Sequence, residues 1–210
     1  MFSGIVQTQG NVVSITDGEN ARHLVISIPA RYLERLDIGA SIAINGVCLT
    51  VVRYEVSPND VVGQVYFDVI DETLRLTNLG GLQQRDKVNV ERSVTFGTEI
   101  GGHIVSGHIQ TTATIRSITR TAENCAMELA LPPKWMKYIL HKGFVAVDGA
   151  SLTVGDTTRD SFMLHLIPET LEVTTLGKRE EGDLINIEVD QQTYTIVNTV
   201  ERYLKESRPA

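Results

Sequence analysis

The chain contains the same sequence unit twice. The stretch "SGIVQTQGNVVSI" from Ser3 aligns with "SGHIQTTATIRSI" from Ser106 at an offset of 103 residues. From Glu72 onward the offset is 97, so the second copy is six residues shorter. The missing residues fall in "VVRYEVSPNDVVGQVYFDV", which reads as a hairpin with a turn over residues 57–60. Because a shortened hairpin leaves the core strands intact, this pattern predicts two copies of one small domain.

Within each copy, most segments alternate between apolar and polar residues. Runs such as "HLVISI", "SIAINGVCLTVV" and "KVNVERS" are short, rich in β-branched residues and bounded by turn residues, which predicts about six strands per copy. Short helices are expected at "PARYLERLD" and "PPKWMKYILH", which open with proline, and at "ETLRLTNL" and "ETLEVTTL". Closure removes the exposed edges of a small sheet. The expected fold is therefore all-β, with two tandem six-stranded Greek-key barrels, closed or nearly closed.

Three units are expected along the chain. Residues 1–97 form the first barrel and residues 98–194 form the second, and each barrel is expected to bind one ligand. Residues 195–210 form a C-terminal α-helix, since one apolar stripe recurs at helical spacing, made of Ile196, Val197, Val200, Tyr203 and Leu204. No counterpart follows the first copy, so this helix is expected to contact another subunit.

Composition narrows the class of function. Of the 210 residues, 42% are hydrophobic. The sequence has no apolar run long enough to span a membrane and no secretory signal, which predicts a cytoplasmic location. The net charge is −7 and the sequence has no cluster of basic residues, which argues against nucleic-acid binding. The histidines show no metal-ligand spacing, and Cys48 and Cys125 cannot form a disulfide framework. Small molecules or protein partners are left.

The two copies differ at a few positions with large chemical consequences. Cys48 in "NGVCLTVV" stands where "DGASLTVG" has Ser151. The other such pairs are Ser41 and Phe144, Ile5 and His108, and Gly39 and Lys142. Positions that are alike suit the fold or a shared ligand, whereas these are candidates for asymmetric chemistry. Each has a structural alternative: Cys48 could be a buried strand residue, Ser41 the first residue of a strand, His108 a surface histidine and Lys142 a solvated loop charge.

Features common to both copies predict a flat ligand with a polar edge. The glycines of "GIVQ" and "GHIQ" allow the backbone to approach a ring closely. The segments "CLT" and "SLT" provide backbone donors and acceptors, and each "ET" opens a helix with free N–H groups. Two similar pockets are therefore expected.

The segments "MFSGIVQ", "SIAINGVCLTV", "ETLRLTNLG", "GGHIVSGHIQTTA", "DGASLTVG" and "IPETLEVTTLGK" together closely resemble the riboflavin synthase alpha-chain family. The resemblance implies a homotrimer assembled through the C-terminal helix, no cofactor and no metal. It implies a transferase that dismutates two molecules of 6,7-dimethyl-8-ribityllumazine into riboflavin and 5-amino-6-(D-ribitylamino)uracil, the last step of riboflavin biosynthesis. It also implies an active site between the first barrel of one subunit and the second barrel of the next.

The same resemblance implies roles for individual residues. Cys48 and Ser41 in the first pocket, and His108 with Thr153 in the second, are expected to transfer protons or stabilise a transient nucleophile. Asp148 and Asp190 match positions that orient those groups or bind ribityl hydroxyls; alternatively, Asp148 only belongs to a turn and Asp190 caps a strand. The expected substrate-binding residues are Gly4, Ile5, Val6, Cys48, Leu49, Thr50, Asp68, Val69, Ile70, Asp71, Glu72, Thr73, Gly107, His108, Ile109, Lys142, Ser151, Leu152, Thr153, His165, Leu166, Ile167, Pro168, Glu169 and Thr170.

Two other functional classes stay open. Lumazine proteins and yellow fluorescent proteins share the duplicated fold and bind a chromophore without turning it over, although Cys48, His108 and "GGHIVSGH" match the catalytic branch. A structural oligomer with incidental pockets would not explain the change between Cys48 and Ser151. The sequence leaves open which barrel holds the donor, what forms the first adduct, and whether the protein associates with lumazine synthase.

Overall fold

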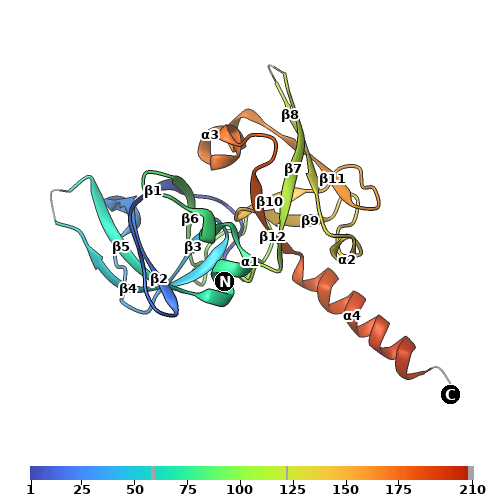
Figure 1. Ribbon diagram of the computed structural model, residues 1–210, viewed down its shortest axis with the longest axis horizontal. Helices are drawn as coiled ribbons and strands as arrows, with labels where there is room; N and C mark the ends of the chain where they lie inside the picture. Colours follow the sequence, from blue (N-terminus) through green and yellow to red (C-terminus); the bar gives the residue numbers. More distant parts are fainter. Residues whose placement is uncertain (58–59, 122, 208–210) are drawn as a thin grey trace.

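Two small antiparallel β-structures, one from each repeat, lie side by side and make up most of the molecule (Figure 1). The computed structural model describes residues 1–57, 60–121 and 123–207. Within these ranges, each helix is too short or too polar to cross a bilayer.

The first repeat forms a closed barrel. Its strands are β1 (Thr8–Asp17), β2 (Ala21–Pro29), β3 (Ser41–Ile44), β4 (Val47–Glu55), β5 (Val62–Ile70) and β6 (Lys87–Arg92), in the order β1-β2-β5-β4-β3-β6. Its helical segments are η1 (Ala30–Tyr32), α1 (Asp71–Leu76) and η2 (Asn78–Gly81). Alternate side chains such as Ile26, Ile44 and Phe67 fill the interior. The helix expected at "PARYLERLD" is only the single 3₁₀ turn η1.

The second repeat forms a nearly closed barrel. Its strands are β7 (Thr111–Arg120), β8 (Cys125–Ala130), β9 (Phe144–Val147), β10 (Ala150–Thr153), β11 (Ser161–Leu166) and β12 (Leu184–Val189), and its helical segments are α2 (Pro133–Met136), α3 (Pro168–Val173) and η3 (Thr175–Lys178). The sheet order β10-β9-β12-β7-β8-β11 leaves β10 and β11 at its two ends. Two duplicated six-stranded barrels were expected, and this is confirmed.

The six-residue deletion explains why only one barrel is closed. In the first repeat β4 and β5 each have nine residues and pair with one another. Their counterparts β10 and β11 have four and six residues, and isolated bonds such as Gly155 N–H to the Met163 carbonyl (2.8 Å) replace the ladder. The shortening therefore affects the seam of the barrel and not its core. Of the hairpin turn expected in the first repeat, Pro58 and Asn59 lie outside the described residues.

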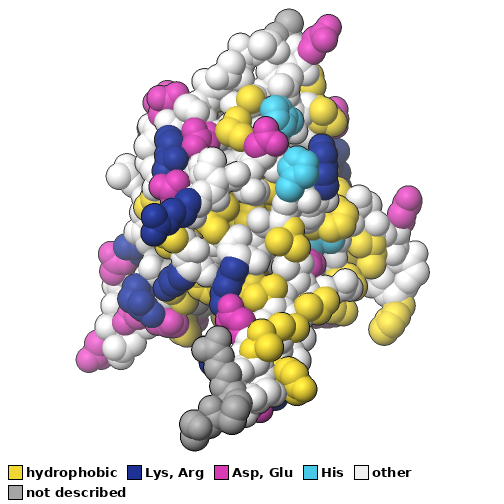
Figure 2. Space-filling view, turned by 90° about the vertical axis from the view of Figure 1, so that its right-hand side faces the viewer, with side chains coloured by type: hydrophobic (Ala, Val, Ile, Leu, Met, Phe, Trp, Pro, Cys, Tyr) yellow, Lys and Arg dark blue, Asp and Glu magenta, His cyan; other side chains and the backbone are white. Residues whose placement is uncertain are grey.

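The C-terminal helix α4 (Gln191–Glu206) projects away from the second barrel (Figure 1). It begins before the expected Thr195 because Asp190 is its N-cap, with a carboxylate oxygen accepting the Thr193 N–H at 2.8 Å. Asp190 thus caps a helix and not a strand. Tyr194 and Val197 pack on the second barrel, whereas Ile196, Val200, Tyr203 and Leu204 are each at least half exposed. Hydrophobic side chains gather near the C-terminal end on this face of the molecule (Figure 2).

Candidate functional site

The two repeats exchange their first residues. Phe2 and Val105 pair in antiparallel fashion where the segments meet, through N–H···O bonds of 2.8 and 3.1 Å. Beyond this point Val6 joins the hydrophobic core of the second barrel, and Ile109 packs against the core of the first. Residues 1–6 and 105–109 are therefore called the crossing segments. Their contacts occur in reciprocal pairs, as a two-fold axis between the barrels requires.

Each crossing segment brings a glycine onto the position where the copies differ. The Gly107 carbonyl accepts the Cys48 N–H at 2.9 Å, and the Gly4 carbonyl accepts the Ser151 N–H at 2.7 Å. Gly4 and Gly107 have φ of +73° and +82°, which favours glycine. An added Cβ would lie 2.6 Å from the Ser151 Cβ or 2.5 Å from the Cys48 Cβ. Only glycine fits at these two positions without a shift of the neighbouring backbone.

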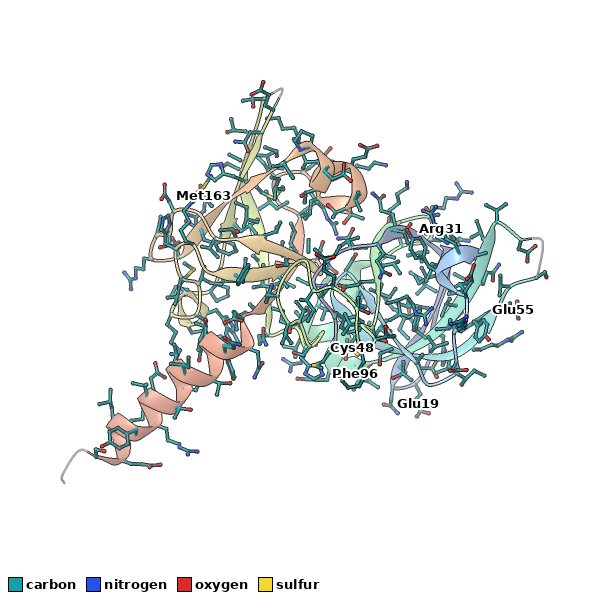
Figure 3. The ribbon with its side chains drawn as sticks, turned by 180° about the vertical axis from the view of Figure 1, so that it is seen from behind. Glu19, Arg31, Cys48, Glu55, Phe96 and Met163 are labelled. Carbon is teal, nitrogen blue, oxygen red and sulfur yellow. The ribbon has the colours of Figure 1, made fainter. Side chains whose placement is uncertain are left out.

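Cys48 lies on the outer face of its barrel. In the β3–β4 ladder Ala43 is opposite Cys48 and Ser41 is opposite Thr50, so these four residues share one face. Ile42 and its alternate neighbours occupy the barrel interior instead. Cys48 is half-buried beneath the crossing segment, at the side of the first barrel that faces the second (Figure 3). It is therefore not a residue of the barrel interior.

The second barrel repeats this arrangement with different side chains. Phe144 is opposite Thr153 and Ala146 is opposite Ser151 in the β9–β10 ladder. Ser151 is half-buried and Thr153 is exposed. The equivalent outer faces thus carry a thiol in one barrel and a hydroxyl in the other.

A cavity of about 240 Å³ lies where the first crossing segment meets the second barrel. It is lined by Gly4, Ile5, Val6, Ala150, Ser151, Leu152, Glu169, Thr170, Val173 and Thr174. Seven of these were expected to bind ligand: Gly4, Ile5, Val6, Ser151, Leu152, Glu169 and Thr170. The Gln9 side-chain amide also donates to the carbonyls of residues 172–174 at 3.1–3.2 Å, which ties the end of α3 to the start of β1. This cavity and its walls are called the second-barrel pocket.

By equivalence of the repeats, the matching surface on the first barrel comprises Gly107, His108 and Ile109 beside β4, together with Glu72 and Thr73 of helix α1. We call this surface the first-barrel pocket. A grouping by repeat placed His108 with Thr153, but the crossing segment sets the residue before His108 against Cys48. Ile5 therefore lines one cavity with Ser151, and His108 follows directly after the residue that contacts Cys48.

The remaining expected residues are distributed around these two surfaces. The side chains of Leu49, Val69 and Leu166 point into the barrel cores, so only their backbone can face a ligand. Asp68 contacts the His23 ring nitrogen Nδ1 at 2.6 Å. The others lie at element ends or in turns and do not line the cavity: Ile70, Asp71, Lys142, His165, Ile167 and Pro168.

His103 is a site residue that was not expected. Its Nδ1 lies 2.6 Å from the Ser151 hydroxyl oxygen, and its ring stacks on Phe144 with 5.1 Å between centroids. Burial lowers the pKa of His103, and the negative charge of Asp190 opposes this. The imidazole is therefore neutral at pH 7 and holds the Ser151 hydroxyl in place. His103 lies in the connection between the repeats, within "GGHIVSGH", and its spacing from other residues did not indicate a functional role.

Asp148 lies in the junction between the barrels and not at either pocket. It is fully buried and accepts hydrogen bonds from the Asn186 N–H (2.8 Å), the Asn78 amide (2.9 Å) and the Arg179 guanidinium (2.8 Å). Burial raises the pKa of Asp148, and Arg179 and the two other donors oppose the rise. In the first repeat the corresponding residues are Asn45 and Leu82, without a charge pair.

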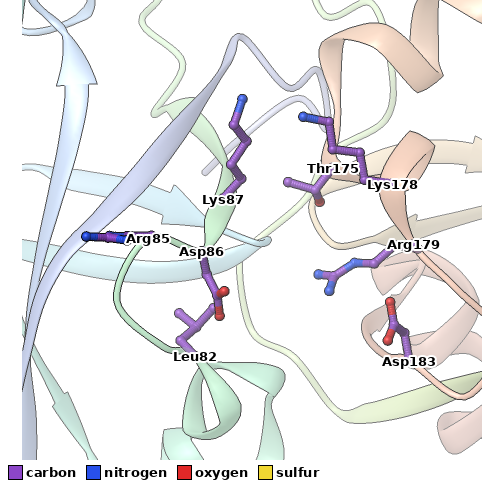
Figure 4. Close-up of a pocket in the computed structure, with 8 residues that line it drawn as sticks. All are labelled: Leu82, Arg85, Asp86, Lys87, Thr175, Lys178, Arg179 and Asp183. Carbon is purple, nitrogen blue, oxygen red and sulfur yellow. The ribbon is translucent and has the colours of Figure 1, made fainter.

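The hollow beside the Asp148–Arg179 ion pair is distinct from the second-barrel pocket. Arg179 and Leu82 both line it, with a volume of about 370 Å³, and Figure 4 shows residues of both barrels around it. Nearby, a Cβ on Gly46 would lie 2.6 Å from the Gly149 nitrogen, so the two equivalent turns abut. These contacts fix the orientation of the barrels relative to one another.

Comparison with known proteins agrees with this architecture. The model of the lumazine binding domain matches residues 3–93 and again residues 106–190. Riboflavin synthase of Escherichia coli (strain K12) is 50% identical over 205 residues, covering 97% of this chain and 93% of that protein. Riboflavin synthase of Chlamydia pneumoniae is 41% identical, covering 99% and 98%. The crystal structure of LumP complexed with riboflavin superposes with a TM-score of 0.80 at 30% identity, covering 91% of this chain and all of that one. The chain belongs to the riboflavin synthase family and contains two lumazine binding domains.

Proposed function

We propose that this chain acts as a riboflavin synthase, a transferase that converts two molecules of 6,7-dimethyl-8-ribityllumazine into riboflavin and 5-amino-6-(D-ribitylamino)uracil. The observation that carries the proposal is the pair of equivalent surfaces built around Gly4 and Gly107, which differ in the facing residues Ser151 and Cys48. The reaction joins two identical molecules in opposite roles. Two pockets with one backbone frame and different side chains suit this requirement.

The chemistry needs few protein groups. The C7 methyl group of one lumazine loses a proton, and the other ring accepts a nucleophile at C7, before a four-carbon unit moves between them. Holding two rings together removes much of the entropic barrier, and each positioned proton-transfer group contributes about 10²–10⁴-fold. A thiol, an imidazole and hydroxyls at the pocket walls are sufficient for such transfers.

We assign these transfers to Cys48, Ser41 and His108 at the first-barrel pocket and to Thr153, which adjoins the wall residue Leu152 of the second-barrel pocket. The assignment is supported by the contact between the Cys48 and Gly107 backbones, which sets the exposed His108 beside the outer face of β4. Asp190 acts indirectly, through its charge near His103. Cys48→Ala and His108→Ala should lower turnover far more than lumazine binding, and turnover at the wild-type level in both would contradict the assignment.

The functional unit is a homotrimer in which the first barrel of one subunit meets the second barrel of the next. The exposed apolar stripe of α4 supports this proposal, because Ile196, Val200 and Tyr203 are each at least half exposed. Sedimentation equilibrium of the purified protein should give three times the chain mass. A monomer at micromolar concentration would contradict it.

The decisive experiment incubates the purified chain with 6,7-dimethyl-8-ribityllumazine and follows riboflavin absorbance and fluorescence. Riboflavin formation is expected. Binding of lumazine without riboflavin would favour a chromophore-binding protein, a class that the likeness to LumP complexed with 6,7-dimethyl-8-(1'-D-ribityl) lumazine keeps in view (TM-score 0.79, 27% identity). Cys48 and the 50% identity to a riboflavin synthase favour the enzyme.

A further inference from the structure

Two buried glutamates hold the crossing segments. The Glu188 carboxylate accepts the Ser106 N–H at 2.8 Å, the Ser106 hydroxyl at 2.7 Å and the Gly107 N–H at 2.9 Å. At the equivalent place, the Glu91 carboxylate accepts the Ser3 N–H, the Ser3 hydroxyl and the Gly4 N–H at 2.7, 2.8 and 3.1 Å. Each carboxylate thus binds the residue that abuts Cys48 or Ser151 on the other barrel.

Burying the two glutamate side chains costs free energy, and packing alone does not explain why they are buried. Glu91 and Glu188 are only 3% and 2% exposed, and no cation pairs with either among the described residues. Burial raises the pKa of both, while the serine and glycine donors oppose the rise; the charge of His108 also opposes it at Glu188. The sequence repeats this acid in "VNVERS" and "INIEVD". Burying an acid twice at equivalent positions indicates a role that an apolar side chain cannot fill.

We propose that Glu188 and Glu91 are positioning residues for the two ligand pockets, each clamping the crossing segment that completes the pocket of the opposite barrel. Glu188 holds Gly107 against Cys48 and so fixes the backbone position of the next residue, His108. Glu91 sets Gly4 against Ser151 and so fixes the Gly4–Ile5 wall of the second-barrel pocket. The role in catalysis rests on the proposed function, whereas the clamp itself does not.

The chain offers a matched pair of variants and an internal probe. Ser106 donates to one carboxylate oxygen of Glu188 and Gly107 donates to the other, so Glu188→Gln, which replaces one oxygen by an NH₂ group, cannot accept from both. Glu91→Gln loses one of the two matching sets of bonds, to Ser3 or to Gly4. Cys48 and Cys125 are the two thiols of the chain, and Cys125 is only 1% exposed in the second barrel. The rate at which a thiol reagent labels each cysteine, followed by mass spectrometry, therefore reports release of the Gly107 segment and general unfolding separately.

Glu188→Gln should label Cys48 about tenfold faster than the wild type, because a lost hydrogen bond to a buried charge shifts a local opening equilibrium by at least that factor. Glu91→Gln should leave the Cys48 rate unchanged, and Cys125 should stay slow in both. Equal acceleration at Cys48 in both variants, or none in Glu188→Gln, would overturn the proposal. If Glu188→Gln does not fold, Ser106→Ala and its match Ser3→Ala remove one bond each and must show the same selectivity.

Riboflavin then tests the link to ligand binding. Protection of Cys48 from the reagent should require about tenfold more riboflavin in Glu188→Gln than in Glu91→Gln, by the same shift in the opening equilibrium. Equal riboflavin requirements would overturn the positioning role. A wild-type chain that forms no riboflavin from lumazine would refute the proposed function and leave the ligand-free labelling result standing.

Discussion

Gly107→Ala tests whether the crossing segment is held by contact with Cys48. Alanine at φ +82° costs about 1–2 kcal/mol, because a Cβ clashes with the backbone in the left-handed region. Its Cβ would also lie 2.5 Å from the Cys48 Cβ and 2.9 Å from the Cys48 nitrogen. Relieving such overpacking costs about 1–3 kcal/mol more. The expected loss in free energy of unfolding is about 2–5 kcal/mol in total.

Gly182→Ala separates the two contributions. Gly182 has φ of +93°, but a Cβ there would have no atom within 4 Å, so this variant carries the backbone cost alone. Urea unfolding followed by circular dichroism gives both free energies under one set of conditions. Gly107→Ala should also lose riboflavin formation, whereas Gly182→Ala should keep it. Equal losses of stability in the two variants would refute the argument that Gly107 is required by close approach to Cys48.

Three further outcomes follow from the junction, from His103 and from α4. Arg179→Leu should lower the free energy of unfolding by about 3–5 kcal/mol because it leaves buried Asp148 unpaired. Adding Asp148→Asn recreates the residues of the other repeat and should recover most of the loss; a double variant no more stable than the single one contradicts this. The lowered pKa of His103 means that the unfolded chain binds its proton first, so stability relative to His103→Gln should fall as the pH drops from about 6.5 to the folded-state pKa. Urea midpoints at pH 8 and pH 5 measure it, and a constant difference would count against a buried neutral imidazole. Deleting residues from Thr195 onward should lower the mass seen by light scattering, and an unchanged mass would exclude α4 as the assembly contact.

The barrels could be predicted because the patterns that define them lie within short stretches of sequence. Alternation along strands such as Ser41–Ile44 and the repeat offset define which faces are buried and where the copies correspond. The deletion located the hairpin that fails to close in the second copy. Asp190 was expected to act near the site or to cap a strand, and its place as the helix N-cap follows from a single hydrogen bond to Thr193.

The crossing could not be predicted in the same way. Residues 1–6 and 105–109 are too short to carry a periodic pattern, and an apolar residue such as Val6 fits the core of either barrel. The ion-pair partner of Asp148 could not be predicted either, because the equivalent of Arg179 in the first repeat is the apolar residue Leu82. Both features depend on which surfaces of the two domains meet. The shared acid at Glu91 and Glu188 was the one available signal.

Exchange of the crossing segments determines which of the residues that differ between the repeats lie together. If every repeat supplied its own pocket, Cys48 would face Ile5 and Ser151 would face His108, so each pocket would hold one reactive group. With the segments exchanged, Gly107 sets His108 next to the Cys48 side of the first barrel, while Ser151 shares a cavity with Ile5 and contacts the buried His103 on the second. The thiol and the exposed imidazole are thus concentrated in one pocket and the opposite pocket holds a hydroxyl fixed by a neutral ring. Two identical substrates would then meet unlike surroundings, although the cores of the two barrels stay alike.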